Sequence, residues 1–143
     1  MSGVLRSGVG AGREPRVEQH EVGCLCGKLR VTATGAPVRV GLCHCLECRK
    51  HHGALFYGAA IWPKDAVQIK GDFGAYQGRC FCPTCGSSVF AQSGDEIEVH
   101  LGAFDQPDRF RPTYEVWTER REAWLPPFTD MTGFKRNREN PDG

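Results

Sequence analysis

The chain of 143 residues carries a formal net charge of +1 at pH 7 and contains eight cysteines. This length suits one domain with a hydrophobic core, and the balanced charge argues against nucleic acid or an anionic membrane as a partner. No segment approaches the roughly 20 consecutive apolar residues that a membrane span needs. We therefore expect a globular protein with no nucleic-acid and no membrane partner.

Residues 1–16 are expected to form a flexible N-terminal leader. The first 13 of them are rich in glycine, serine and arginine and include no acidic residue. They also lack an apolar run of signal-peptide length, so we expect a cytoplasmic protein whose thiols stay reduced. The alternative interpretation of so many cysteines is the disulfide framework of a small secreted domain.

Short runs of alternating apolar and polar residues predict a mainly β structure over residues 17–130, which we expect to be a single domain. No long stretch has the apolar period of about 3.6 residues that marks an amphipathic helix, so helix should be limited to residues 47–52. Residues 131–143 are expected to be a flexible C-terminal tail. In chain order, the expected strands are 17–23, 29–33, 38–42, 54–61, 67–69, 89–91, 97–101 and 114–118.

Three groups of cysteines within this domain have the spacing of metal ligands. Thiolates are soft ligands, and Zn²⁺ binds four of them, or their imidazole equivalents, in a tetrahedron. Three sulfurs from one segment, with no obvious fourth ligand, are typical of an open zinc site that can bind a substrate. Residues 17–130 are therefore predicted to be a zinc-binding β domain. The groups are Cys24 and Cys26, then Cys43, Cys45 and Cys48, and finally Cys80, Cys82 and Cys85.

Spacing alone leaves two ways to divide the eight sulfurs. In one division each Cys-x-Cys-x-x-Cys segment has its own site, and Cys24 is separated from Cys26. In the other, Cys24 and Cys26 join Cys82 and Cys85, the central segment keeps its three sulfurs, and Cys80 is left as a buried bystander. The second division keeps each ligand turn whole and closes a long loop, where a metal adds most to folding.

Three ordered motifs resemble the glutathione-dependent formaldehyde-activating enzyme family, which includes centromere protein V. They are GCLCG at 23–27, CHCLECRK at 43–50 and FCPTCG at 81–86, and the similarity runs from about Val22 to Phe128. The resemblance implies a small β-tent type of fold with two zinc ions per chain. It assigns a structural zinc to Cys24, Cys26, Cys82 and Cys85, and a catalytic zinc to Cys43, Cys45 and Cys48.

The family's reaction joins formaldehyde to glutathione, giving S-hydroxymethylglutathione, and members are described as carbon–sulfur lyases. The resemblance therefore implies a zinc-dependent lyase that acts on adducts of glutathione, or another small thiol, with formaldehyde or a related small carbonyl. A zinc-bound substrate thiolate suits this chemistry, because a free thiol with a pKa near 8.5 loses its proton when it binds the ion. The alternative is a non-catalytic zinc-binding module that interacts with another protein.

Side chains around the central cysteines are weaker candidates for function. Arg49 and Lys50 are candidates to bind a glutathione carboxylate, since arginine presents a planar fork of donors. His44 alternates with the sulfur ligands and should point away from the metal. Arg120 and Arg121 are expected to be a solvated charge run. The aromatic residues expected in the core, rather than in a ligand platform, are Phe56, Tyr57, Trp62, Trp117 and Trp124.

Overall fold

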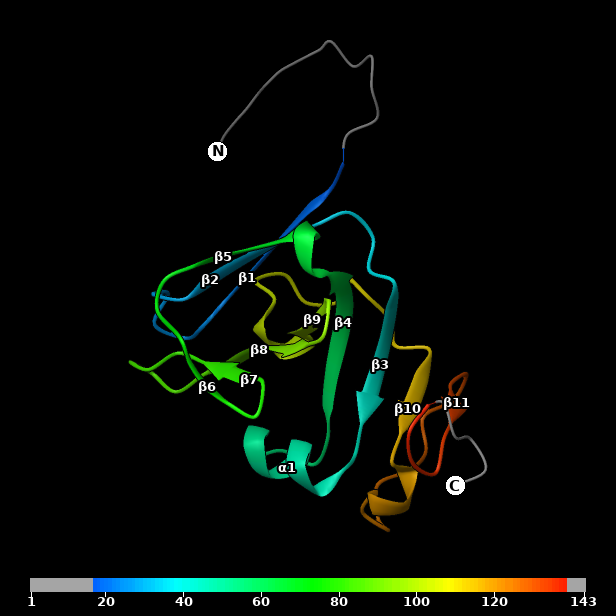
Figure 1. The fold of residues 1–143 in the computed structure, drawn as a ribbon. Helices are drawn as coiled ribbons and strands as arrows, with labels where there is room; N and C mark the ends of the chain where they lie inside the picture. The colour runs from blue at the N-terminus through cyan, green and yellow to red at the C-terminus, as the bar shows by residue number, and fades with distance from the viewer. Residues whose placement is uncertain (1–16, 139–143) are drawn as a thin grey trace.

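The computed structural model describes residues 17–138, so the predicted leader 1–16 lies outside the described residues. Within this range the chain forms two β-sheets and one short α-helix (Figure 1). The prediction of a mainly β fold with short strands and little helix is confirmed. None of the helices between residues 17 and 138 has the length and hydropathy needed to cross a membrane.

The smaller sheet is antiparallel and has the strand order β1–β2–β5. Alternate residues of β2 face the core, so that Val31 and Ala33 are fully buried while Thr32 between them is not. This is the pattern that alternating apolar and polar residues produce on a strand with one wet face. The strands are β1 (Gln19–Gly23), β2 (Arg30–Thr34) and β5 (Val67–Lys70).

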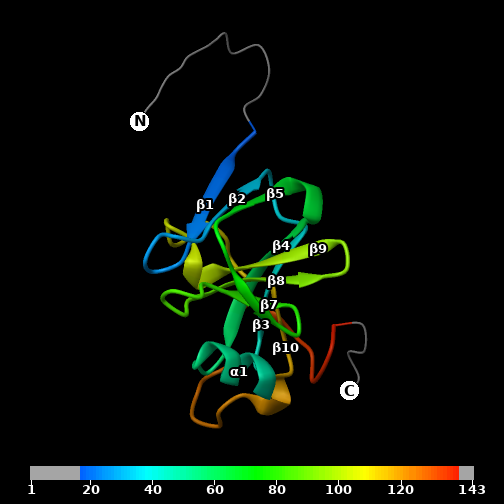
Figure 2. The same cartoon turned by 60° about the vertical axis from the view of Figure 1, so that its left-hand side comes forward.

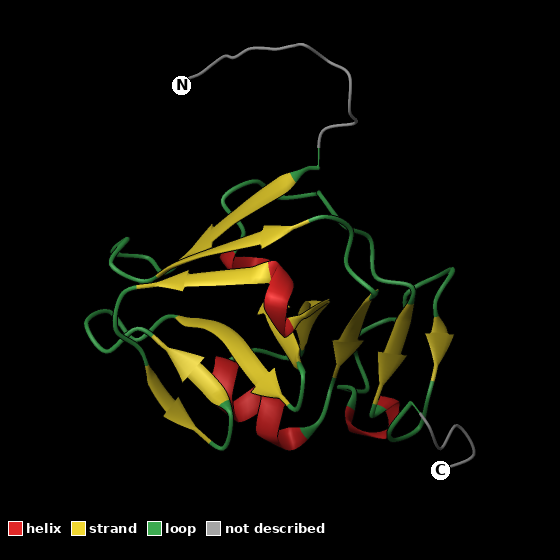
Figure 3. Ribbon diagram, turned by 45° about the horizontal axis from the view of Figure 1, so that its top comes forward, coloured by secondary structure: helices red, strands yellow, loops and turns green. Residues whose placement is uncertain are grey.

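The larger sheet has the order β11–β10–β3–β4–β9–β8–β7–β6. Its strands are antiparallel except that β10 runs parallel to both β3 and β11. In Figure 3 the three strands of the smaller sheet lie together above the strands of the larger sheet. The strands are β3 (Arg39–Cys43), β4 (Tyr57–Pro63), β6 (Gly74–Tyr76), β7 (Arg79–Phe81), β8 (Ser88–Ser93), β9 (Glu96–His100), β10 (Tyr114–Val116) and β11 (Thr132–Gly133).

The helix α1 (Leu46–His52) connects β3 to β4 at one end of the larger sheet (Figure 2). Its C-cap is Gly53, which has a φ of 60° and donates its N–H to the carbonyl oxygen of Arg49. Glycine adopts this left-handed conformation without a Cβ clash, so the chain can turn sharply back into β4. Three short 3₁₀ helices complete the fold: η2 (Lys64–Ala66), η3 (Leu101–Ala103) and η4 (Thr118–Arg120).

The hydrophobic core brings together side chains of both sheets. Val22 and Val31 come from the smaller sheet, and Trp62, Phe90 and Val99 come from the larger one, all of them fully buried. Burial of each aliphatic or phenyl side chain contributes about 1.5–3 kcal/mol relative to exposure. The indole N–H of Trp62 donates to the carbonyl oxygen of Gly35 at 3.1 Å, so burial leaves no polar atom unpaired there. This core anchors β4, and β4 in turn positions β3.

Close contact between β3 and β10 depends on a glycine. A Cβ atom placed on Gly41 would lie 2.3 Å from the ring of Tyr114, so glycine is what allows this ring to approach β3 so closely. The pairing brings Val116 next to Cys43 in the parallel register. As a result, a strand from late in the chain lies beside the central cysteines.

The C-terminal segment adds a strand to the larger sheet. A flexible tail was expected from residue 131, whereas Thr132 and Gly133 form β11 and pair with β10. Phe134 donates its backbone N–H to Glu115 at 2.9 Å, and Arg136 accepts the N–H of Trp117 at 3.0 Å. The position of this segment depends on backbone hydrogen bonds to residues that are distant in sequence. Its charged composition gives no sign of such bonds. The rest of the predicted tail, 139–143, lies outside the described residues.

Candidate metal centres and their cavity

Four cysteines from two turns form one cluster. Cys24 and Cys26 lie between β1 and β2, and Cys82 and Cys85 lie between β7 and β8. The four ligand atoms all lie within 4.8 Å of one another. The Sγ–Sγ distance is 3.6 Å between Cys24 and Cys26 and 3.7 Å between Cys26 and Cys82. The structure thus brings together the sulfurs of the second division.

The geometry of this four-sulfur cluster fits a tetrahedral metal ion. With Zn–S bonds of about 2.3 Å, two thiolates on one zinc lie about 3.8 Å apart. The Sγ–Sγ distances of 3.6 and 3.7 Å agree with this value. A disulfide would need about 2.05 Å, and all eight cysteines are free. Four sulfurs complete a tetrahedron, so this cluster could hold a closed, structural metal ion, consistent with zinc.

Hydrogen bonds around the four-sulfur cluster favour thiolates. Leu29 donates its backbone N–H to Cys24 Sγ at 3.2 Å, and Thr84 donates its own to Cys82 Sγ at 3.4 Å. The hydroxyl of Ser87, 3.2 Å from Cys85 Sγ, helps to lower the pKa of Cys85 to about 5. Donors aimed at sulfur stabilise its negative charge and orient it as a ligand.

The second cluster comes from one short segment. Cys43 ends β3, Cys45 is the N-cap of α1, and Cys48 lies in the first turn of that helix. Cys45 donates its N–H to Cys43 Sγ at 3.5 Å, and Cys48 donates its N–H to Cys45 Sγ at 3.3 Å. The thiols of Cys43 and Cys48 donate hydrogen bonds to Cys45 and lower its pKa to about 2, with Cys43 having the larger effect. The hydrogen bond between Cys43 and Cys45 in turn raises the pKa of Cys43 to about 12. Three thiolates this close repel one another, so the donor set fits a divalent cation.

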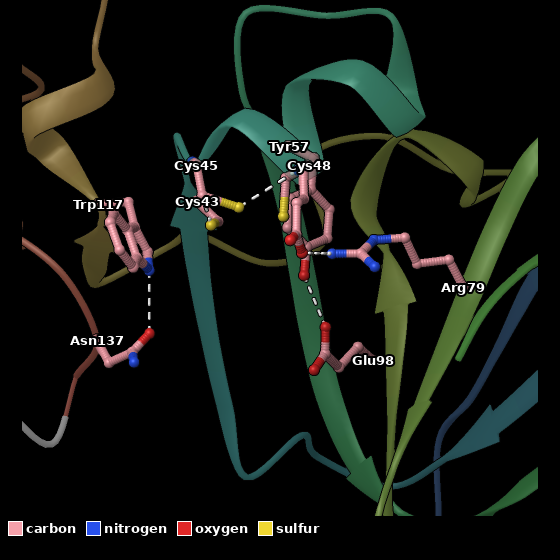
Figure 4. Close-up of polar contacts among 9 residues, drawn as sticks. Cys43, Cys45, Cys48, Tyr57, Arg79, Glu98, Trp117 and Asn137 are labelled. Carbon is pink, nitrogen blue, oxygen red and sulfur yellow. Dashed lines mark hydrogen bonds and ion pairs between the residues drawn. The ribbon is translucent and has the colours of Figure 1, made fainter. Parts of the chain in front are cut away.

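A cavity of about 670 Å³ opens beside this three-sulfur cluster. All three of its cysteines line the cavity, whereas none of the four-sulfur cluster is among the described lining residues. The volume is typical of sites for small molecules. Figure 4 shows the sulfurs between two walls, with Trp117 and Asn137 on one side and Tyr57, Arg79 and Glu98 on the other. A metal held by these three sulfurs would therefore be accessible to a ligand in the cavity.

Comparison with known families identifies one family whose matched range contains both cysteine clusters. The model of the family described as glutathione-dependent formaldehyde-activating enzyme matches residues 19–120. The chain belongs to this family. The matched range begins at β1 and contains both cysteine clusters, so the family resemblance predicted from the three motifs is confirmed. A search among curated proteins found no match.

In this member of the formaldehyde-activating family, one cavity wall contains residues that the sequence did not predict. Tyr57 donates its hydroxyl to Glu98 Oε1 at 2.6 Å and stacks on His52 with ring centroids 4.5 Å apart. Desolvation raises the pKa of Tyr57 and lowers those of His52 and His100 to about 4 and about 3. The phenol is therefore protonated and both imidazoles are neutral at pH 7. Tyr57 lies opposite Cys43 in the β3–β4 register, which sequence alone does not give.

The expected placement of the aromatic residues in the core is only partly correct. Trp62 is fully buried as predicted, whereas Trp124 is 68% exposed. Tyr57 and Trp117 line the cavity instead of packing wholly inside the core. Phe56 is half-buried and packs against Phe128, with ring centroids 5.5 Å apart. Hydrophobicity predicted that these rings would be shielded, but not that two of them would face a ligand site.

Behind the three-sulfur cluster lies a polar triad formed by the buried His44 and Glu115 and the partly buried Arg121. His44 Nε2 donates to Glu115 Oε1 at 2.8 Å, and Arg121 Nη2 lies 2.8 Å from the other carboxylate oxygen. The side chains of His44 and Glu115 are 0% and 3% exposed. The prediction that His44 points away from the sulfurs is confirmed, and the prediction that Arg121 is solvated is wrong. Because an unpaired buried charge is costly, this triad fixes the cysteine segment against β10.

Arg49 and Lys50, the predicted glutathione contacts, are not among the described residues that line the cavity. Arg49 donates to the carbonyl oxygen of Arg120 at 2.8 Å and also pairs with Glu122, while Lys50 is exposed. Arg49 thus fastens α1 to the 120–122 segment. Cys80 is buried in the core, as predicted, and belongs to neither cluster.

Proposed function

We propose that this protein is a zinc-dependent carbon–sulfur lyase. Its substrates would be adducts of glutathione, or of another small thiol, with formaldehyde or a related small carbonyl. The observation that carries the proposal is that the three-sulfur cluster lines the cavity while the four-sulfur cluster does not. Family membership supports the choice of thiol and aldehyde, since the family is described by its glutathione-dependent activation of formaldehyde.

The three-sulfur cluster is suited to leave one coordination position for a substrate. Cys43, Cys45 and Cys48 provide three ligands, and within residues 17–138 no further cysteine, histidine or carboxylate joins their group. Bound zinc supplies a positive charge that keeps a thiol in its thiolate form at neutral pH. The backbone N–H donors to Cys43 and Cys45 hold these sulfurs in place without blocking the cavity.

The cavity wall provides groups for the proton that the reaction releases. When the adduct is cleaved, the carbon–sulfur bond breaks, sulfur keeps the electron pair, and the hydroxyl group loses its proton as the carbonyl forms. Glu98 is suited to take this proton, because Tyr57 donates to one of its oxygens and leaves the other available. The neutral rings of His52 and His100 pack against Tyr57 and hold it in position. In the reverse direction the same carboxyl group returns the proton.

The test combines a spectroscopic and a kinetic measurement on the wild type and on Cys45→Ser. In cobalt-substituted wild type, glutathione should change the thiolate-to-metal absorption, and the zinc enzyme should accelerate exchange between S-hydroxymethylglutathione and free formaldehyde measured by NMR. Cys45→Ser should show neither effect and keep the absorption of the four-sulfur cluster. If glutathione leaves the wild-type spectrum and the exchange rate unchanged, the protein is better described as a non-catalytic zinc-binding interaction module.

A further inference from the structure

Residues 132–138 contribute one wall of the cavity. They lie beyond residues 19–120, which the family model matches. Even so, Asn137 and Arg138 line the cavity together with the three central cysteines. Family membership therefore does not account for this wall, and the charged composition of the segment led to the expectation of a flexible tail. Because this wall lies beside the three-sulfur cluster, its residues are placed to contact a ligand bound there.

A ladder of backbone hydrogen bonds holds this segment in place. Strand β11 pairs in parallel with β10, and Thr132 donates its N–H to Thr113 at 3.1 Å. Phe134 donates its N–H to Glu115 at 2.9 Å and accepts that of Thr118 at 3.1 Å. Each such bond contributes about 0.5–1.5 kcal/mol net, so the ladder as a whole keeps the wall formed before a ligand arrives.

The segment also fixes Trp117 in an unusual backbone conformation. Trp117 has a φ of 57° and a ψ of 41°, a left-handed region that costs a residue with a Cβ about 1–2 kcal/mol. Its N–H donates to the carbonyl oxygen of Arg136 at 3.0 Å, and its indole N–H donates to Asn137 Oδ1 at 3.0 Å (Figure 4). The guanidinium of Arg136 lies 5.8 Å from the ring centroid. Strained residues held by several contacts cluster at ligand sites, and here they aim the indole at the cavity.

The charges on this wall are suited to an anion. Arg138 lies over the ring of Tyr114 at 5.8 Å, and Arg120 lines the same cavity. Between residues 17 and 138, neither arginine has a carboxylate oxygen within 4.0 Å, although the charge of Arg138 helps Arg39 to lower the pKa of Glu96. The other two arginines of the cavity, Arg39 and Arg79, are paired with glutamates. A guanidinium whose hydrogen-bond donors are not taken up by a protein carboxylate can bind one from a ligand through two parallel hydrogen bonds.

We infer that residues 132–138 form the specificity element of this cavity and select thiols that carry a carboxylate. Arg138 binds that carboxylate, with Arg120 as a second cation of the same cavity, while the thiol group lies at the three-sulfur cluster. Trp117 and Asn137 form the side wall between these two ends. The inference rests on the proposed function, because it requires the thiol to bind at that cluster. Small neutral thiols lack the group that the arginines bind and are held only by sulfur.

The experiment compares two thiols on the zinc-loaded full chain by calorimetry. Glutathione carries carboxylates and 2-mercaptoethanol carries none, so the wild type should bind glutathione at least about tenfold more tightly. Arg138→Ala should weaken glutathione binding about tenfold and leave 2-mercaptoethanol unchanged. Arg138→Glu should weaken glutathione binding further, about a hundredfold, and Arg138→Lys should restore only part of the loss, because lysine keeps the charge but not the planar pair of donors. High salt should reduce the preference for glutathione in the wild type.

The matched control is Lys135→Ala, which removes an exposed cation of the same segment that does not line the cavity. Its affinities for both thiols should equal those of the wild type. Equal losses in Lys135→Ala and Arg138→Ala, or equal losses for the two thiols, would overturn the inference. A wild type that binds both thiols equally well also overturns it, but leaves the proposed function standing. A wild type that binds neither thiol overturns both.

Discussion

The two cysteine clusters use the same ligand chemistry but are built from the chain in opposite ways. The four-sulfur cluster joins turns that are 56 residues apart at Cys26 and Cys82, and Cys24 and Cys82 are buried beside the core. The three-sulfur cluster comes from residues 43–48 alone and opens into the cavity. A metal in the first cluster ties distant parts of the fold together, whereas a metal in the second is accessible to ligands. The origin of the ligands in the chain thus supports the proposal that the first cluster is structural and the second is reactive.

Removing a ligand from the four-sulfur cluster should have the largest effect on stability. Binding of structural zinc is worth about 10–16 kcal/mol in small zinc peptides, which is comparable to the whole stability of a domain. Cys82→Ser should therefore unfold or aggregate the protein, as measured by circular dichroism and zinc content. Cys80→Ser is the control, because that buried thiol belongs to neither cluster and should give a folded protein with two zinc ions.

Breaking the polar triad should have the next largest effect. Glu115→Ala leaves His44 and Arg121 without their carboxylate, which should lower the free energy of unfolding by about 3–5 kcal/mol in urea denaturation. Because the triad orients the cysteine segment, cobalt affinity at the three-sulfur cluster should also fall about 10–100-fold. Glu119→Ala, which breaks the more exposed pair with Arg136, should change stability by about 1 kcal/mol or less. Equal weakening of both metal clusters by Glu115→Ala would contradict a local role.

Acid should lower the free energy of unfolding through His100, which lines the cavity. Its folded pKa of about 3 lies below the ordinary value of 6.5, because burial disfavours the charged ring. Above pH 6.5 both folded and unfolded states hold it neutral, but below that pH only the unfolded state takes up the proton. Between pH 6.5 and 5 this should lower the free energy of unfolding by about 2 kcal/mol. His100→Gln should show a pH profile shallower by that amount in urea denaturation, and parallel profiles would contradict the prediction.

Removing a ligand from the three-sulfur cluster should change stability least. Cys45→Ser should lose one metal ion and any thiol chemistry, but lower the free energy of unfolding by about 1 kcal/mol or less. Its partner sulfurs are neighbours in sequence and can also bind metal in the unfolded chain, so binding there favours the folded state only weakly. Thermal denaturation and zinc counts would test this. A Cys45→Ser protein that melts while Cys82→Ser stays folded would reverse the roles of the two clusters.

Features set by local spacing could be predicted from the sequence. The alternation in β2, the turn after Cys82 and the side of the chain to which His44 points all follow from neighbouring residues. The three motifs also predicted the family correctly. The pairing of the four-sulfur cluster was favoured because it keeps each short ligand turn whole, and this argument again needs only local geometry.

Features that depend on strand pairing between distant segments could not be predicted. Tyr57 faces the cavity because it lies opposite Cys43, and Arg121 is partly buried because β10 carries Glu115 to the edge of β3. The position of Asn137 depends in the same way on β11, a strand of two residues that no sequence pattern distinguishes from a tail. These residues make the walls of the cavity, so the cysteine clusters were easier to predict than the side chains that surround the cavity.

The distance in sequence between Cys26 and Cys82 affects the order in which the two clusters can bind metal during synthesis. At translation rates of about 5–20 residues per second, the 56 residues between Cys26 and Cys82 take roughly 3–11 s to synthesise. During that interval Cys24 and Cys26 have emerged without their partners, whereas residues 43–48 emerge together and can capture an ion at once. The nascent chain is therefore expected to acquire its reactive metal before its structural one. Metal supply during synthesis then matters most for the two early thiols, which stay exposed to oxidation until the second turn arrives.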